Sequence, residues 1–280
     1  MHLGSLLAAS ASFIDARSHG GRWLVRIEDL DPRSIPGCAA RMLHTLEAFA
    51  LHWDGAVEYQ SRRTAHYQRS LERLRAAGVT FECSCSRAQL AHAGASSTRY
   101  PGTCRSGPRR PGPTATRVRI DEQRAITFED RFQGPCTCPA GSLGDVIVRR
   151  RDGVFSYQLA VVVDDALQGV TDVVRGADLL ESTGWQILLQ EALGLPRPRY
   201  AHLPLITEPA GGKLAKSRRS VALDPARPGA QLHEILRLLR QSPPPSLSPA
   251  PAREVLAWAI AHWNPDAFHG MRTIALGGTG

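Results

Sequence analysis

Apolar positions recur at helical spacing in some segments and as short continuous runs in others, and the two patterns alternate along the chain. Residues 5–18 have the helical pattern and stop at Gly20-Gly21. The RWLVRIED that follows has the pattern of a buried strand running into an acidic loop. The same patterns predict helices over 36–52, 62–77, 177–193, 232–240 and 253–263, and regular structure in DVIVRRRDG and VTDVVRG. In QLAVVVDD, periodicity alone does not separate a helix from a strand. Helices alternating with buried strands predict an α/β fold.

Composition changes between residues 84 and 142, where Gly, Pro, Ser and Arg dominate. The stretch RYPGTCRSGPRRPGPTATRVR contains six arginines and no acidic residue. We therefore predict an insertion over 82–142 within an α/β domain over 1–206. The remaining residues, 207–280, are predicted to form a Gly- and Lys-bearing loop and a short helical C-terminal region, with SPPPSLSPAPA as a linker.

Charge and hydropathy narrow the class of protein. No apolar run approaches the ~20 residues that cross a bilayer, and the apolar residues 6–13 lack the basic leader of a signal peptide. A net charge of +8 favours a polyanionic partner such as nucleic acid. Because nearly all of this charge is arginine, a compositional bias toward Arg explains it equally well, and basic charge alone decides little.

Six cysteines include two Cys-x-Cys pairs, Cys83 with Cys85 and Cys136 with Cys138. In a chain without an export signal, such pairs favour metal ligation in a reducing compartment over a disulfide framework. We therefore expect a cytoplasmic protein.

Both ends of the chain carry patterns suited to phosphate. His2-Leu3-Gly4-Ser5 opens the first predicted helix, and the free N–H groups and dipole of a helix start favour anions. Lys213 and Lys216 are the only lysines among 34 Lys and Arg residues, and both lie in one Gly-bearing loop. A flexible ammonium can follow a phosphate as it moves, whereas arginine presents a planar fork.

Four motifs occur in a characteristic order: His-x-Gly-Ser at a helix start, RIEDLD after a strand, VVRGAD, and finally KLAKS. This order resembles the class I aminoacyl-tRNA synthetases of the glutamyl type, whose first and last signatures are HIGH and KMSKS. The match runs from residue 2 to about residue 220. It implies a Rossmann-like parallel sheet of the class I synthetase type, with a zinc-bearing insertion and a small helical C-terminal tail.

The resemblance also implies roles for individual residues. His2, Gly4, Lys213 and Lys216 correspond to catalytic positions; His2, Gly4 and Lys216 bind ATP, which acts with Mg²⁺. Three further residues correspond to the glutamate site, where Glu28 takes the α-ammonium, Arg175 a carboxylate, and Tyr157 closes the pocket. Without the resemblance, Glu28 and Arg175 would be interpreted as ion-pair partners and Tyr157 as part of the core.

Within the family, the short paralogues that transfer glutamate to queuosine in tRNA(Asp) match best, because only about 60 residues follow KLAKS. Their zinc pattern corresponds to Cys83, Cys85, Tyr100 and Cys104 in this sequence. A rival four-cysteine site, with Cys136 and Cys138 joining Cys83 and Cys85, stays open on spacing alone. The implied partners are ATP, L-glutamate and tRNA(Asp) containing queuosine, and we expect a monomer.

Relatives in this family carry a strand before the first signature, which ends in an RFAPSPSG-like segment. Only Met1 precedes His2 here, so we expect the first strand of the sheet to be missing. A start codon placed too far downstream, a shortened chain or a natural truncation would each explain this. Two alternative functions therefore stay open: a truncated glutamyl-tRNA synthetase charging the tRNA 3′ end, and a catalytically inactive RNA-binding relative.

Overall fold

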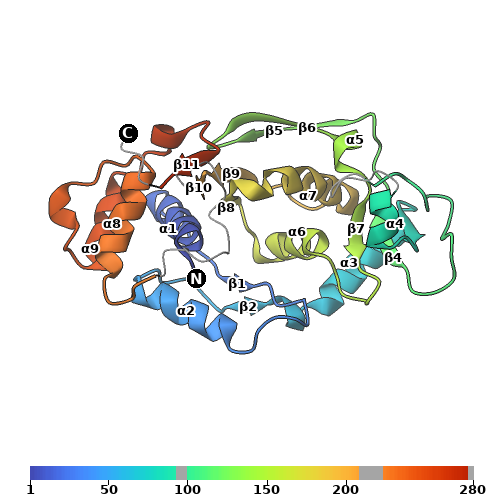
Figure 1. The fold of residues 1–280 in the computed structure, drawn as a ribbon, viewed down its shortest axis with the longest axis horizontal. Coiled ribbons are helices and arrows are strands. Elements are labelled where there is room, and N and C mark those ends of the chain that lie inside the picture. The colour runs from blue at the N-terminus through green and yellow to red at the C-terminus, as the bar shows by residue number, and fades with distance from the viewer. Residues whose placement is uncertain (93–99, 208–222, 277–280) are drawn as a thin grey trace.

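A computed structural model describes residues 1–92, 100–207 and 223–276 of the 280-residue chain. Figure 1 shows an elongated molecule with helices α8 and α9 at one end and α4 with β4 at the other. The described helices are α1 Leu3–Ser18, α2 Cys38–Ala48, α3 Thr64–Ala76, α4 Arg87–His92, α5 Ala140–Leu143, α6 Tyr157–Gln168, α7 Leu180–Leu193, α8 Pro228–Leu238 and α9 Ala252–Ala261. The described strands are β1 Arg26–Ile27, β2 Glu58–Tyr59, β3 Thr80–Cys83, β4 Ala115–Val118, β5 Ala125–Asp130, β6 Gly134–Pro139, β7 Val146–Arg149, β8 Asp172–Gly176, β9 Arg199–Leu203, β10 Leu205–Thr207 and β11 Thr273–Ala275.

The largest sheet has four strands in the order β6-β5-β9-β8. Strands β5, β9 and β8 are parallel, and β6 joins β5 as an antiparallel hairpin. Successive residues of β9 point to opposite faces. Tyr200 accordingly packs with α7 in one hydrophobic cluster, while Ala201 and Leu203 pack with α1, α8 and α9 in another. Helices thus cover both faces, which confirms the predicted α/β class.

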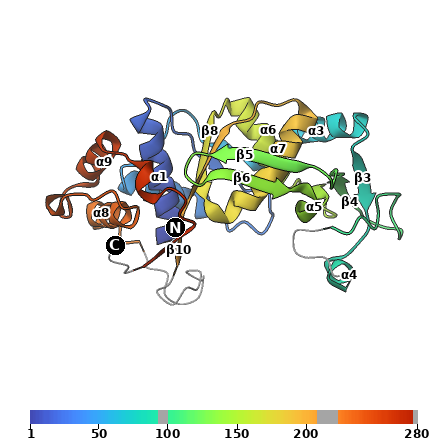
Figure 2. The ribbon, with the colours of Figure 1, turned by 90° about the horizontal axis from the view of Figure 1, so that it is seen from above.

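Two segments are arranged in a way that the sequence pattern does not specify. The hairpin of β5 and β6, which lies within the predicted insertion over 82–142, extends the main sheet along β9. Figure 2 shows this hairpin lying along the body of the molecule, away from α4. Of RWLVRIED only Arg26–Ile27 forms a strand, which pairs in parallel with β2.

Most predicted helices are confirmed, with ends shifted by a few residues. The ambiguous QLAVVVDD lies within α6, whose residues 159–165 are all buried. These seven consecutive residues cover nearly two helical turns, so this stretch is buried on every side and its sequence shows no amphipathic period. None of the helices in the described part of the chain is long and apolar enough to cross a membrane.

A cavity of about 520 Å³ lies between β8 and the segment around β1, with the C-terminal half of α1 along one wall. Its charged lining includes Asp15, Arg26, Glu28, Arg131 and Asp165.

Candidate active site

The start of α1 is organised by His2. Its exposed imidazole caps the helix, because Nδ1 accepts the backbone N–H of Ser5 at 3.2 Å and Nε2 lies 3.0 Å from the Ser5 hydroxyl. When Nδ1 accepts, the neutral ring carries its proton on Nε2, which then remains a donor. A Cβ added at Gly4 would lie 3.3 Å from two atoms of this ring. Gly4 therefore leaves room for the imidazole itself.

Arg175 on β8 is held by neutral acceptors. Its Nε donates to Nε2 of His202 at 3.1 Å, and one terminal nitrogen donates to the Thr183 hydroxyl at 2.8 Å. The other terminal nitrogen lies 3.5 Å from the Tyr157 hydroxyl. Within the described residues, no carboxylate lies within ion-pair distance of Arg175. The alternative interpretation of Arg175 as a structural ion-pair residue therefore has no partner in this part of the chain, and its charge is available to an anion.

Glu28 follows β1 and lines the cavity. Its side chain is 42% exposed and lies 3.8 Å from the guanidinium of Arg26. Partial desolvation of this carboxyl group among the surrounding protein atoms raises the pKa of Glu28, and Arg26 and Arg175 oppose this effect. Burial also raises the pKa of Tyr157, which feels the charges of both Arg175 and Glu28. The three residues predicted for the glutamate site are therefore close enough to influence one another electrostatically.

A buried ion cluster joins the strand pair β1–β2 to α6. Asp164, which is 0% exposed, accepts from Nε of Arg63 at 2.7 Å, the Tyr67 hydroxyl at 2.6 Å and the Gln60 amide at 3.1 Å. Next to it on α6, Asp165 pairs with Arg26 at 2.8 Å. The cluster thus connects the segment that carries Glu28 to the helix that begins with Tyr157.

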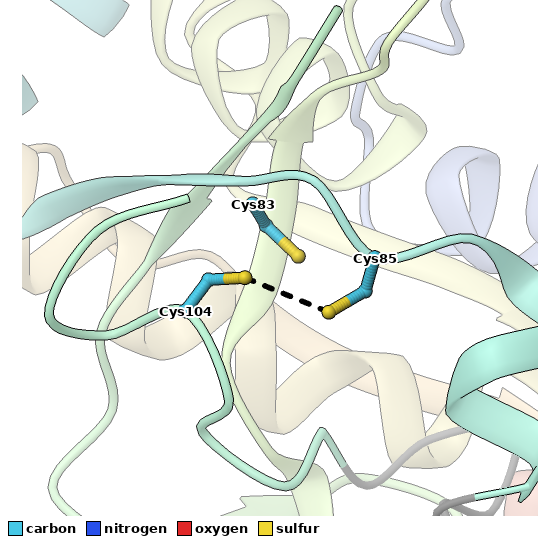
Figure 3. A group of neighbouring side chains, drawn as sticks. All are labelled: Cys83, Cys85 and Cys104. Atoms are coloured by element: carbon cyan, nitrogen blue, oxygen red, sulfur yellow. Dashed lines mark hydrogen bonds between the residues drawn. The ribbon is translucent and has the colours of Figure 1, made fainter. Parts of the chain in front are cut away.

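The predicted metal ligands meet at the far end of the molecule. The sulfurs of Cys83, Cys85 and Cys104 all lie within 4.8 Å of one another. Figure 3 shows the three thiols converging from β3, the residues just after it and the loop before β4. A hydrogen bond of 3.5 Å links Sγ of Cys85 to Sγ of Cys104. The Tyr100 hydroxyl lies 3.3 Å from Sγ of Cys83 and accepts the backbone N–H of Cys104 at 2.8 Å. Four donors are therefore gathered as a tetrahedral site requires.

The second cysteine pair lies elsewhere. Cys136 and Cys138 are on β6, opposite Phe128 and Ile126 of β5, and they belong to the hydrophobic cluster under α7. The four-cysteine alternative is therefore not brought together, because the β5–β6 hairpin carries this pair into the main sheet.

The described residues thus bring together Glu28, Tyr157 and Arg175, and separately the three cysteines with Tyr100. Lys213 and Lys216, predicted to bind ATP phosphates, lie outside the described residues. Sequence reasoning missed His202 and its partner Asp130, which are 72 residues apart in the chain and 2.5 Å apart in space. The only sequence signal is their type, since a histidine in an apolar strand needs a buried polar partner.

The sequence matches known proteins over most of its length. The family model for tRNA synthetases class I (E and Q), catalytic domain, matches residues 1–227. The glutamyl-Q tRNA(Asp) synthetase of Pseudomonas aeruginosa PAO1 is 51% identical over 267 residues, which cover 94% of this chain and 89% of that protein. The protein of the same name from Aromatoleum aromaticum is 49% identical over 269 residues, covering 94% of this chain and 85% of that one.

Solved structures show the same fold at lower identity. A glutamate tRNA ligase from Elizabethkingia meningosepticum, crystallised with its amino acid, superposes with a TM-score of 0.81 at 23% identity. The glutamate-tRNA synthetase of Elizabethkingia anophelis gives a TM-score of 0.82, also at 23% identity. These matches cover 98% and 99% of this chain, which spans 64% and 65% of those two proteins. The family model and the close relatives together show that the chain belongs to the class I tRNA synthetases of the E and Q type.

Proposed function

We propose that this chain activates glutamate with ATP and transfers the glutamyl group to queuosine in the anticodon of tRNA(Asp). Its similarity to relatives named glutamyl-Q tRNA(Asp) synthetase supports this, at 51% identity over 94% of the chain. The observation that carries the amino-acid half is Arg175, whose guanidinium is held by neutral acceptors near the carboxylate of Glu28. A cation and an anion close enough to influence each other electrostatically suit a ligand with two carboxylates and an ammonium group.

In the first step a glutamate carboxylate attacks the α-phosphate of ATP, which gives glutamyl-adenylate and pyrophosphate. Arg175 binds one carboxylate of the amino acid, Glu28 accepts hydrogen bonds from its ammonium group, and the Tyr157 ring closes the pocket. The reaction needs little covalent help from the protein, because positioning and stabilisation of charge dominate phosphoryl chemistry.

The ATP phosphates bind at the start of α1. The backbone N–H groups there and Nε2–H of His2 are donors for phosphate oxygens, while Gly4 preserves the room that the imidazole occupies. The family resemblance assigns Lys213 and Lys216 to the triphosphate, and Mg²⁺ bound with ATP would offset its negative charge. Their ammonium groups matter most as charge builds up in the transition state.

Zinc is the metal that best fits the cysteine cluster. Three thiol sulfurs and a phenol oxygen converge within a segment whose own hydrophobic cluster is small: among the described residues its buried members are Phe81, Cys83, Tyr100 and Cys104. A structural zinc stabilises such a segment by fixing ligands that apolar burial alone holds weakly. Zinc bound by these residues would order this end of the molecule and would take no part in the chemistry.

The function is tested in two assays on the purified protein. Glutamate-dependent exchange of pyrophosphate into ATP, with no tRNA present, measures the first step. Transfer of radiolabelled glutamate is then compared on tRNA(Asp) with queuosine, tRNA(Asp) without it, and tRNA(Glu). We expect label only on the first, from a monomeric cytoplasmic enzyme.

Other outcomes identify the alternatives. Charging of tRNA(Glu) would indicate a glutamyl-tRNA synthetase that acts on the 3′ end. Binding of tRNA without any glutamate activation would indicate an inactive RNA-binding relative.

A further inference from the structure

His202 on β9 is completely buried between a carboxylate and the candidate substrate-binding arginine. The side chains of both His202 and Asp130 are 0% exposed, and Nδ1 of the ring lies 2.5 Å from Oδ2 of Asp130. On the other side, Nε of Arg175 donates to Nε2 of the same ring at 3.1 Å. The parallel register aligns these groups, because His202 is directly opposite Arg175 on β8 and Asp130 ends the neighbouring strand β5.

Asp130 is held as an anion. Its Oδ1 accepts the backbone N–H groups of Phe132, Gln133 and His202 at 2.9–3.0 Å. Burial by itself would raise the pKa of Asp130, but hydrogen bonds from His202 and these amides outweigh it and lower the pKa. An ionised carboxylate only accepts, so Nδ1 of His202 carries the proton and Nε2 presents its lone pair to Arg175.

The imidazole itself stays neutral. Burial lowers the pKa of His202, and the charge of Arg175 lowers it further, against the opposing effect of Asp130. A neutral ring orients the guanidinium through one hydrogen bond without forming an ion pair with it. Had a carboxylate stood in the place of His202, it would have neutralised the charge that a substrate carboxylate needs.

The remaining contacts of Arg175 complete the orientation. One terminal nitrogen is held by the Thr183 hydroxyl at 2.8 Å, and the Leu179 carbonyl lies at 3.4 Å. The second terminal nitrogen has only the long 3.5 Å contact with Tyr157 among the described residues. Arginine has five N–H donors, so the hydrogens on this nitrogen remain for a ligand.

We infer that Asp130 and His202 are positioning residues that orient Arg175 for the substrate carboxylate, with His202 as a neutral link between two charges. The inference rests on the proposed function, because it assigns glutamate as the ligand of Arg175. Neither residue touches the ligand, and both act through the guanidinium.

Two substitutions of His202 separate positioning from structural support. In His202→Asn the amide can still donate to Asp130 but is too short to reach Arg175. In His202→Gln the side-chain oxygen can accept from Arg175 where Nε2 does. We expect His202→Asn to raise KM for glutamate about tenfold, because this variant loses one hydrogen bond to a charged group. KM for ATP should stay within about twofold of wild type, and His202→Gln should recover most of the glutamate affinity.

His233→Asn is the matched control. His233 is also buried, on α8, where Nε2 lies 3.2 Å from the Pro244 carbonyl. This variant measures the general effect of losing a buried imidazole and should leave both KM values unchanged. If Asn and Gln at position 202 raise KM for glutamate equally, or if KM for ATP rises in parallel, the positioning role is overturned.

Calorimetric titration with L-glutamate, which needs no catalysis, separates this inference from the proposed function. Wild-type protein that binds glutamate but makes no adenylate would refute the proposed function. The ratio of affinities between the Asn and Gln variants would still decide the role of His202. Wild-type protein that binds no glutamate would refute both.

Discussion

The carboxylate of Asp164 on α6 binds the chain segment that follows β2, and this contact holds the strand pair β1–β2, next to Glu28, against α6. Removing the carboxylate should therefore weaken both the stability of the protein and its binding of glutamate. Three donors from the segment after β2 converge on it: Arg63 at 2.7 Å, Tyr67 at 2.6 Å and Gln60 at 3.1 Å. In Asp164→Ala all three lose their acceptor in a site that is closed to water, since Asp164 is 0% exposed.

Removing one member of a buried ion pair typically costs about 3–5 kcal/mol. Arg63 keeps a second partner, Glu58 at 3.1 Å, whose side chain is 38% exposed. We therefore expect a loss near the lower limit, about 3 kcal/mol in the free energy of unfolding. Tyr67→Phe removes a single hydrogen bond to the same carboxylate and should cost about 1.5 kcal/mol.

Urea unfolding followed by circular dichroism measures both losses, and pyrophosphate exchange measures KM for glutamate in the same preparations. A higher KM for glutamate in Asp164→Ala, with kcat little changed, would show that the cluster positions Glu28. A loss of stability below about 1 kcal/mol for Asp164→Ala would refute the reasoning, because desolvation would then offset the attraction within the cluster.

Cys104→Ser should abolish stoichiometric zinc, measured by atomic emission, whereas Cys136→Ser should retain it; loss of zinc from both variants would contradict the three-cysteine site. Lys216→Ala should slow pyrophosphate exchange on the order of a hundredfold with a much smaller effect on ATP affinity. An equal loss in rate and affinity would argue against a role in the transition state. Because partial desolvation raises the pKa of Glu28, KM for glutamate should increase as the pH falls through that pKa, where the carboxyl group gains a proton and no longer attracts an ammonium. Glu28→Gln should bind glutamate weakly and lack this pH dependence, and a variant that keeps it would place the titrating group elsewhere.

The local sequence pattern was sufficient to predict several helices of this protein and the family to which it belongs. The helix over Leu3–Ser18, the helix that ends at Gly194 and the order of the four motifs were all predictable, because each depends on residues close together in the chain. Gly194, for example, adopts φ +59° after α7, a conformation that glycine enters without strain. The family membership inferred from those motifs is confirmed.

Only the tertiary structure determined which residues far apart in the chain lie in contact. Cys83 and Cys136 each begin a Cys-x-Cys pair, and the two pairs look alike in the sequence. The pairing of β5 with β9 nevertheless carries the pair that begins at Cys136 into the main sheet, while the pair that begins at Cys83 lies beside Tyr100 and Cys104. The contact between Asp130 and His202 likewise depends on strand register, which a local pattern does not specify. Periodicity records which face of an element is buried, but not which element lies opposite. The contact of Arg175 with His202, and that of His202 with Asp130, therefore depend on the alignment of strands β8, β9 and β5 in the folded protein.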